Sequence, residues 1–308
     1  MKKILLLLAA SLFCCLTLQM NQVEASSSQD ALIQDLPLTQ PFYAIAHHVI
    51  TTSGVKAAAK HGANAIEVDV SSWPSQGGWL ADHDHMTLLQ AGDSIEKVFN
   101  AVTEANNNGG KIRFVWLDIK TPVYVKDQTS PASLTGLQKV AQSLLESHNV
   151  YVQFGFTSKD AQKFDIIHNL MNSVTDKESI DLWGDTNQAL SVFETYAPQL
   201  PAKQRSIDNG LFFIPFGFEY RLKQLEEARQ AVQQGKIGRT YSWTVTCGQE
   251  KYVNSLLDNA RVDGIIYGNP AFRYRDTSAN IKTLNSIIDA VKARANMYRL
   301  ANANDNPW

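Results

Sequence analysis

Three carboxylates stand at the ends of two short apolar runs in the first half of the chain. Glu67 and Asp69 close the run that begins at Ala65, and Asp118 closes the run that begins at Arg113. Because residues i and i+2 of a strand share a face, Glu67 and Asp69 should project side by side. If the two strands are neighbours, the three carboxylates form the oxygen-rich type of site that Mg²⁺ prefers. The spacing therefore predicts a magnesium site.

Two histidines flank these carboxylates. His47 ends the first apolar run of the chain, and His83 follows the short run that starts at Trp79. Imidazole titrates near neutral pH, so one ring can accept a proton while the other donates one. A lone histidine is more often structural, but two beside three carboxylates favour acid–base chemistry. On an extended chain His48 points away from His47, which predicts a structural role or a loop contact, whereas His85 could reach the site.

Further polar and aromatic side chains share the same two-residue spacing. Lys120 follows Asp118, and Trp243 follows Tyr241 on a later apolar run. The two aromatic rings could stack against a cationic headgroup such as a quaternary ammonium. The alternative for both is ordinary packing inside a barrel.

Eight short apolar runs alternate with longer amphipathic segments, and such alternation is typical of a barrel of parallel strands surrounded by helices. The predicted strands are Tyr43–His47, Ala65–Val70, Arg113–Asp118, Val150–Phe154, Ser179–Trp183, Leu211–Pro215, Thr240–Val245 and Gly264–Tyr267. Helical segments are expected near 53–61, 94–107, 132–148, 159–172, 188–197, 220–234, 249–259 and 276–299. We therefore predict an α/β fold, a single-domain (β/α)₈ TIM barrel over residues 41–300. Chemistry in such barrels lies at the carboxyl ends of the strands, where the polar residues fall.

The N-terminus has the three-part pattern of a secretory signal peptide over residues 1–25, followed by a polar leader over residues 26–40. Lys2 and Lys3 precede an apolar run from Ile4 to Leu18, and small residues lead to a cut after Ala25. The run is too short to span a membrane, so no transmembrane segment is expected. We expect a secreted protein, extracellular or periplasmic.

Charge and motif content exclude several classes of protein. The formal net charge is −2 at neutral pH, which gives no electrostatic case for binding nucleic acid or for a polybasic membrane anchor. The chain has no nucleophile elbow, Walker loop, zinc-type cysteine pair or dinucleotide glycine fingerprint. The chemistry that remains is metal-assisted work on a phosphoester.

The chain resembles the sphingomyelinase D/phospholipase D toxins of spider venoms and of certain bacteria and fungi, within the wider glycerophosphodiester phosphodiesterase-like barrels. The similar stretches are Ala46–Val49, Gly62–Asp69, Trp79–Asp84, Leu117–Lys120, Tyr241–Trp243 and Val262–Ile265. The resemblance implies three groups of site residues, namely catalytic His47 and His83, Mg²⁺ ligands Glu67, Asp69 and Asp118, and substrate contacts Lys120, Tyr241 and Trp243. Thr246 stands where venom members carry an aspartate, and Asn269 is displaced by one from their asparagine.

The resemblance also implies an activity. These enzymes release choline from sphingomyelin and lysophosphatidylcholine, largely by attack of a substrate hydroxyl that leaves a cyclic phosphate. A membrane surface would supply the substrate, and we expect a monomer. The tail 301–308 resembles the tail of microbial members, which plugs the barrel base. Two alternatives stay open, a glycerophosphodiester phosphodiesterase that hydrolyses small phosphodiesters and a catalytically inactive barrel that binds headgroups or glycans.

Overall fold

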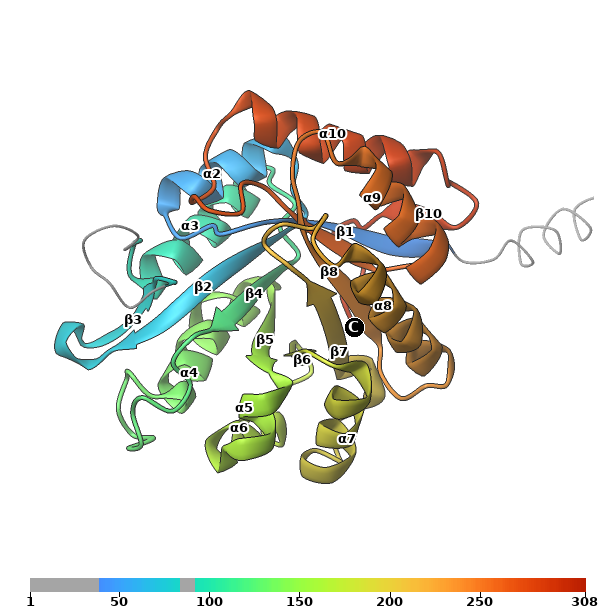
Figure 1. Cartoon of the computed structure of the whole chain (residues 1–308). Helices are drawn as coiled ribbons and strands as arrows, with labels where there is room; N and C mark the ends of the chain where they lie inside the picture. The colour runs from blue at the N-terminus through green and yellow to red at the C-terminus, as the bar shows by residue number, and fades with distance from the viewer. Residues whose placement is uncertain (1–38, 84–91) are drawn as a thin grey trace, which may run out of the picture. The chain divides into compact units, whose positions relative to one another are not determined.

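The computed structural model describes residues 39–83 and 92–308. Within these residues, eight parallel strands close into a barrel in which β1 pairs with both β2 and β9 (Figure 1). The strands are β1 (Gln40–Ala46), β2 (Ala65–Trp73), β4 (Phe114–Ile119), β5 (Tyr151–Thr157), β6 (Glu178–Trp183), β7 (Arg205–Gly210), β8 (Arg239–Val245) and β9 (Gly264–Tyr267). The short strand β3 (Gly78–Ala81) extends β2 as an antiparallel hairpin. The predicted TIM barrel is confirmed.

Helices pack around the outside of the barrel (Figure 1). They are α2 (Thr52–His61), α3 (Ile95–Asn107), α4 (Leu134–Leu144), α5 (Ser158–Lys163), α6 (Asp165–Met171), α7 (Thr186–Tyr196), α8 (Phe218–Gln233), α9 (Glu250–Ser255) and α10 (Ser278–Lys292). Several of them begin at a residue whose side chain caps the helix. For α2, the Thr51 hydroxyl accepts from the Gly54 N–H, and Gly62 ends the helix with a φ of 96°. None of the helices in the described residues has the length and apolar character to cross a membrane.

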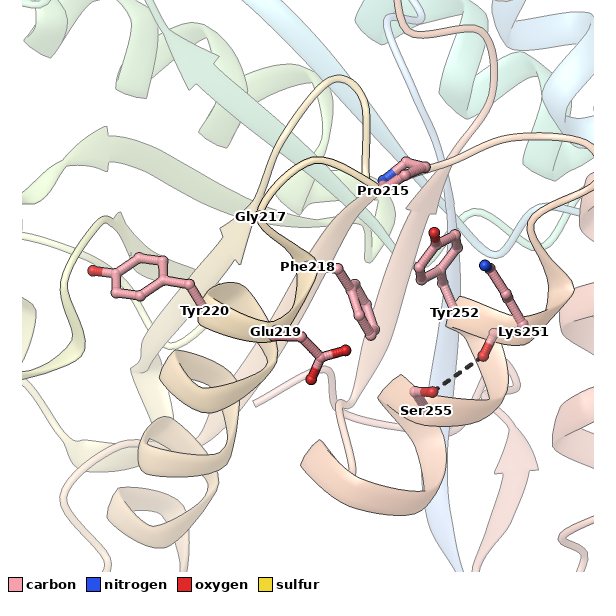
Figure 2. Close-up of a pocket in the computed structure, with 8 residues that line it drawn as sticks. All are labelled: Pro215, Gly217, Phe218, Glu219, Tyr220, Lys251, Tyr252 and Ser255. Atoms are coloured by element: carbon pink, nitrogen blue, oxygen red, sulfur yellow. Dashed lines mark hydrogen bonds between the residues drawn. The ribbon is translucent and has the colours of Figure 1, made fainter.

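One predicted strand is wrong. We predicted a strand at Leu211–Pro215, but β7 is the preceding polar segment, and the apolar run forms a loop that leads into α8. Ser206 of β7 is buried, and its hydroxyl donates to Asp181 on the neighbouring β6 at 2.7 Å. The sequence of β7 is polar because polar side chains of β6 and β7 contact one another in this part of the barrel wall. Figure 2 shows the end of the loop at Pro215 and Gly217, with Phe218 facing Tyr252.

A second cluster of apolar side chains is separate from the helix-facing core and gathers the residues that fill the barrel. It consists of Tyr43, Ile45, Ala65, Phe114, Trp116, Tyr241, Ile266, Ala301 and Trp308. The C-terminal Trp308 lies against the first residues of two strands, with ring centroids 6.0 Å from Phe114 and 5.1 Å from Tyr151. Its indole N–H donates to the Asp176 carbonyl at 3.2 Å. The tail 301–308 therefore closes the amino-terminal end of the barrel, as predicted.

Replacing Trp308 by alanine is expected to destabilise the fold by about 3–5 kcal/mol, the usual cost of removing a buried tryptophan. The Trp308 side chain is almost wholly buried, so its removal would leave a cavity. Urea unfolding of the purified protein measures the change. Asn304→Ala, in the exposed part of the same tail, serves as the control and should leave the midpoint unchanged. Equal midpoints for both variants would contradict the plug.

Candidate active site

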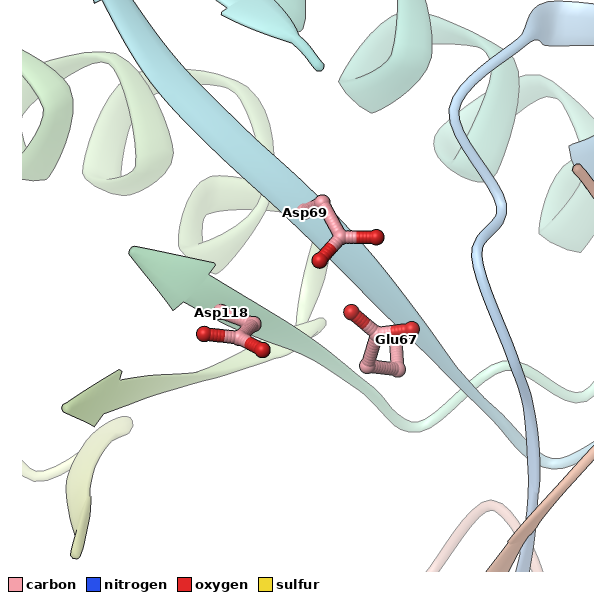
Figure 3. A group of neighbouring side chains, drawn as sticks. All are labelled: Glu67, Asp69 and Asp118. Atoms are coloured by element: carbon pink, nitrogen blue, oxygen red, sulfur yellow. The ribbon is translucent and has the colours of Figure 1, made fainter. Parts of the chain in front are cut away.

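Three carboxylates meet at the carboxyl ends of two adjacent strands. Glu67 and Asp69 lie two residues apart on β2, and Asp118 lies on β4 directly beside Asp69 in the strand register. Each contributes an oxygen atom, and these atoms lie within 4.8 Å of one another (Figure 3). Glu67 and Asp69 are buried, whereas Asp118 is half-buried. This is the arrangement that the two-residue spacing predicted, completed by the pairing of β2 with β4.

Lys120 compensates part of this negative charge. Its ammonium lies 2.8 Å from an Asp69 oxygen and 2.6 Å from an Asp118 oxygen. Burial acts to lower the pKa of Lys120, but the two carboxylates outweigh it and hold the pKa well above its usual value. With all three acids ionised, one lysine leaves two negative charges uncompensated, which matches a divalent cation.

The hydrogen bonding of Glu67 suits a metal ligand. Its Oε2 accepts a hydrogen bond from the His48 backbone N–H at 2.7 Å. Its Oε1 is buried and has no hydrogen-bond partner among the described residues. Burial, and then the charges of Asp69 and Asp118, raise the pKa of Glu67 well above its usual value. A bound cation would relieve both penalties, so these residues fit Mg²⁺, which takes oxygen ligands.

His47 follows the end of β1 with its ring oriented by the backbone. Its Nδ1 lies 2.9 Å from the Asn269 carbonyl oxygen, and a carbonyl can only accept, so Nδ1 carries the hydrogen. Nε2 then carries the free lone pair of the ring, and this atom lies 3.9 Å from a Glu67 oxygen. Burial lowers the pKa of His47 to about 4, so the ring is neutral near pH 7. The Asn269 carbonyl thus orients the His47 ring and fixes its tautomer.

His48 also belongs to the site, against the prediction that it points away. Its Nδ1 lies 2.7 Å from an Asp69 oxygen, and its ring centroid lies 5.7 Å from that of His47. The prediction assumed an extended chain, but His48 has a φ of 55°, which breaks the alternation of side chains. With Lys120 and His48 beside it, the pKa of Asp69 lies well below its usual value, although burial acts to raise it.

His83 reaches the site through the β2–β3 hairpin. The Asp82 N–H donates to the Asp69 carbonyl at 2.9 Å, which ties the end of β3 to β2 beside the carboxylates. The His83 ring is exposed and its centroid lies 6.0 Å from that of His48. The Asp82 carboxylate accepts from the Trp73 indole at 3.2 Å. His85 lies outside the described residues.

The two predicted aromatic contacts lie at different depths of the barrel. Trp243 is half-buried near the end of β8, and its ring centroid lies 6.3 Å from that of Trp183 on β6. Tyr241 is fully buried in the cluster that fills the barrel, 5.2 Å from Trp116 between centroids. This placement corrects the expectation that Tyr241 contacts the substrate, because no solvent-accessible surface remains on it. The aromatic ring beside Trp243 belongs instead to Trp183, which the sequence reasoning did not select.

Tyr241→Phe should therefore leave kcat/KM within about threefold, since its buried hydroxyl has no hydrogen-bond partner among the described residues. If Trp243 binds a cationic headgroup, Trp243→Ala should lower kcat/KM about 10- to 30-fold, as expected for loss of a desolvated cation–π contact of ~2 kcal/mol. Steady-state kinetics measure both variants. A large loss in Tyr241→Phe with an unchanged Trp243→Ala would reverse this assignment.

Asp181 on β6 and Asp208 on β7 form a buried acidic pair farther along the wall. Burial raises the pKa of Asp181 to about 7. Burial and the neighbouring Asp181 raise the pKa of Asp208 well above its usual value. Burial therefore disfavours the charged form of both carboxyl groups. Sequence reasoning missed Asp208 because it placed β7 five or more residues too late.

Comparisons with known proteins agree with one another. The family model described as Sphingomyelinase D/Phospholipase D matches residues 38–308. A sphingomyelinase D of Uncinocarpus reesii is 37% identical, over 87% of this chain and 78% of that protein. A dermonecrotic toxin of Loxosceles laeta is 25% identical, over 87% of this chain and 97% of the toxin. Among solved structures, the active domain 2 of a chitinase from Pyrococcus furiosus matches with a TM-score of 0.53 at 13% identity, over 83% of this chain and 97% of that one, which supports the fold alone.

Proposed function

Because the chain belongs to the sphingomyelinase D/phospholipase D family, and is thus a phosphodiester-cleaving enzyme of that family, we propose that it is Mg²⁺-dependent and releases choline from sphingomyelin or lysophosphatidylcholine. The observation that carries the proposal is the meeting of two histidines, three carboxylates and a lysine at one barrel mouth. A barrel that only bound headgroups would have no need of the complete set.

His47 is the proposed base. Its neutral ring presents Nε2 as a lone pair, while the Asn269 carbonyl holds the other nitrogen and fixes the tautomer. In the proposed reaction, Nε2 takes the proton from the substrate hydroxyl nearest the phosphodiester. The hydroxyl oxygen forms a new bond to phosphorus and closes a cyclic phosphate. A ring that stays neutral at pH 7 is suited to accept this proton.

His83 is the proposed acid. As the bond between phosphorus and the choline oxygen breaks, that oxygen takes a proton from the protonated His83 ring, and choline leaves as the free alcohol. Its exposed position near the end of β3 allows solvent to restore the proton after each turnover. The proton held by His47 leaves to solvent in the same way, so the reaction has no net proton demand.

Lys120 and an ion held by the three carboxylates are proposed to stabilise the negative charge of the phosphate. Mg²⁺ bound by Glu67, Asp69 and Asp118 would supply a positive charge that stabilises negative phosphoryl oxygens. The Lys120 ammonium is fixed by two carboxylates and kept charged by them, so it can bind a phosphoryl oxygen without changing its protonation. Trp243 and Trp183 would take the quaternary ammonium of choline on their ring faces.

Export is proposed from residues 1–25, which carry the signal-peptide pattern and lie outside the described residues. N-terminal sequencing of the protein recovered from the medium or periplasm would test it. A sequence beginning at Ser26 is expected, and an uncleaved cytoplasmic protein would contradict it.

The proposed activity is tested by incubating the mature protein with sphingomyelin, lysophosphatidylcholine and glycerophosphocholine, each with Mg²⁺ or with a chelator. Mass spectrometry identifies the products. Choline with a cyclic phosphate from the first two substrates, dependent on the ion, is the expected result. Turnover of glycerophosphocholine alone would favour the glycerophosphodiester phosphodiesterase instead, and activity that survives exhaustive chelation would remove the metal role.

A further inference from the structure

Among the described residues, exposed aromatic side chains are concentrated at one end of the barrel. Six of the seven large apolar residues that are exposed there follow the carboxyl ends of β4, β7 and β9, the end at which the active site lies. The loop between β7 and α8 holds most of them, with Phe212 exposed by 66%, Phe213 by 53% and Phe216 by 74%. Phe272, in the loop after β9, is exposed by 65%. Exposed aromatic side chains gathered at one end of a barrel indicate an interaction surface.

The loop from Leu211 to Gly217 is held in place although its phenylalanines face solvent. Ile214 and Phe218 are buried and pack into the helix-facing core on either side of Phe216. The Leu211 N–H donates to the Trp243 carbonyl at 3.0 Å, and the Thr244 N–H donates to the Leu211 carbonyl at 2.9 Å. The loop is therefore anchored at the barrel end of β8, directly beside the proposed headgroup contact Trp243.

The loop that carries Phe272 is anchored to the catalytic side as well. The Asn269 side-chain oxygen accepts hydrogen bonds from the backbone N–H groups of Ala271 and Phe272, at 2.9 and 3.1 Å. The Asn269 carbonyl oxygen accepts from His47. The Gly268 N–H donates to the Val245 carbonyl at 3.0 Å, so this loop flanks the end of β8 on its other side. Both aromatic loops thus border the same part of the mouth.

We propose that the four exposed phenylalanines at positions 212, 213, 216 and 272, here called the aromatic rim, insert into a phosphocholine-bearing membrane surface and hold the mouth against its lipid substrate. This inference rests on the proposed function for its choice of lipid. Aromatic side chains favour the interfacial region of a bilayer, where an apolar ring meets polar headgroups. An enzyme whose substrate is anchored in a bilayer needs its mouth turned to that surface.

One pocket beside the rim has lining charges that suit a zwitterionic headgroup. This pocket of about 430 Å³ lies next to the loop that joins β7 to α8, in the space between helices α8 and α9 (Figure 2). Its lining residues include Pro215, Glu219, Lys251 and Tyr252. Its lining therefore carries one carboxylate and one ammonium, which complement the ammonium and the phosphate of a phosphocholine headgroup. The whole chain has a net charge of −2, so it has no general attraction to anionic lipid.

Co-sedimentation with large vesicles of diacyl phosphatidylcholine tests the proposal. This lipid lacks a free hydroxyl beside its phosphodiester, so the proposed internal attack does not consume it. The triple variant Phe212→Ser, Phe213→Ser, Phe216→Ser should bind vesicles at least about tenfold more weakly, because interfacial binding scales with the apolar area inserted. Ile281→Ser, which removes an exposed apolar residue from α10, is the matched control and should bind like the wild type.

Two further measurements distinguish a loss of vesicle binding from a loss of folding. The triple variant should keep the wild-type melting temperature, because the replaced side chains are exposed, and Phe216→Trp should bind vesicles at least as well as the wild type. Turnover of sphingomyelin in vesicles should fall with binding in the triple variant. Turnover of a short-chain lysophosphatidylcholine below its micellar concentration should stay within about twofold of the wild type, since the rim does not touch the reacting atoms.

Several outcomes would overturn the proposal. The proposal fails if the wild type does not bind the vesicles, or if the triple variant binds them as well as the wild type does. It also fails if light scattering shows a wild-type dimer that the triple variant dissociates while vesicle binding is unchanged. Rim-dependent binding without turnover of either lipid would support docking and refute the proposed activity, so the two failures are distinguishable.

Discussion

His47→Ala is expected to lower kcat/KM for choline release by about 10²–10⁴-fold, the range for loss of a positioned acid or base. The physical reason is that Nε2 is the free lone pair of a neutral ring whose other nitrogen is bound to the Asn269 carbonyl. Alanine removes that acceptor and leaves the three carboxylates in place. Steady-state choline release from micellar lysophosphatidylcholine measures the loss.

Added imidazole separates a chemical role of His47 from a structural one. If the residue transfers a proton, free imidazole can enter the space left by the ring and restore part of the activity of His47→Ala. A merely structural residue would show no such recovery. His148→Ala, far along the chain and at the surface, is the control and should keep activity within about twofold, as for surface substitutions generally. Full activity in both His47→Ala and His83→Ala would refute the acid–base assignment.

Glu67→Gln is expected to abolish most of the Mg²⁺ dependence and to lower kcat/KM by about 10²–10³-fold, as for loss of a group that acts on transition-state charge. Glutamine keeps the shape of the side chain but removes the charge that an ion would neutralise. Titration with Mg²⁺, followed by activity, gives the change in apparent affinity. Glu104→Gln on α3, an exposed partner of Lys56, is the control and should titrate like the wild type.

Thermal unfolding supplies a readout of the same variant that does not depend on turnover. Mg²⁺ should raise the melting temperature of the wild type, because a ligand that binds only the folded state stabilises it. The same ion should have little effect on Glu67→Gln. In chelator the variant should be no less stable than the wild type, since burial and the charges of Asp69 and Asp118 both disfavour an ionised Glu67. An equal Mg²⁺ response in both proteins would remove Glu67 from the ligand set.

Local side-chain alternation explains why part of the site was predictable. Glu67 and Asp69 share a face because a strand repeats every two residues, wherever the strand lies in the fold. The same rule failed at His48, where a single residue with positive φ reversed the direction of the side chain. It also failed for β7, where a polar residue such as Ser206 is buried and donates its hydroxyl hydrogen to Asp181 on the neighbouring strand. Periodicity describes a strand only while the backbone stays extended and its partners are apolar.

Depth along the barrel was beyond the reach of the sequence pattern. Tyr241 and Trp243 obey the same spacing, yet one is sealed inside the barrel and the other borders the mouth. What separates them is the register of β8 against its neighbours and the cluster around the C-terminal Trp308 that fills the lower barrel. Both depend on segments far away in the chain.

The sequence by itself determined the barrel, the family resemblance and the candidate site residues, because strand period, helix caps and residue type act over a few neighbouring positions. Only the tertiary structure decided which of those residues meet. The pairing of Asp69 with Asp118, the Asn269 support of His47 and the aromatic loops on either side of β8 all join segments that are distant in sequence. Closing a barrel sets such contacts through strand register, a non-local quantity that no short stretch of residues encodes.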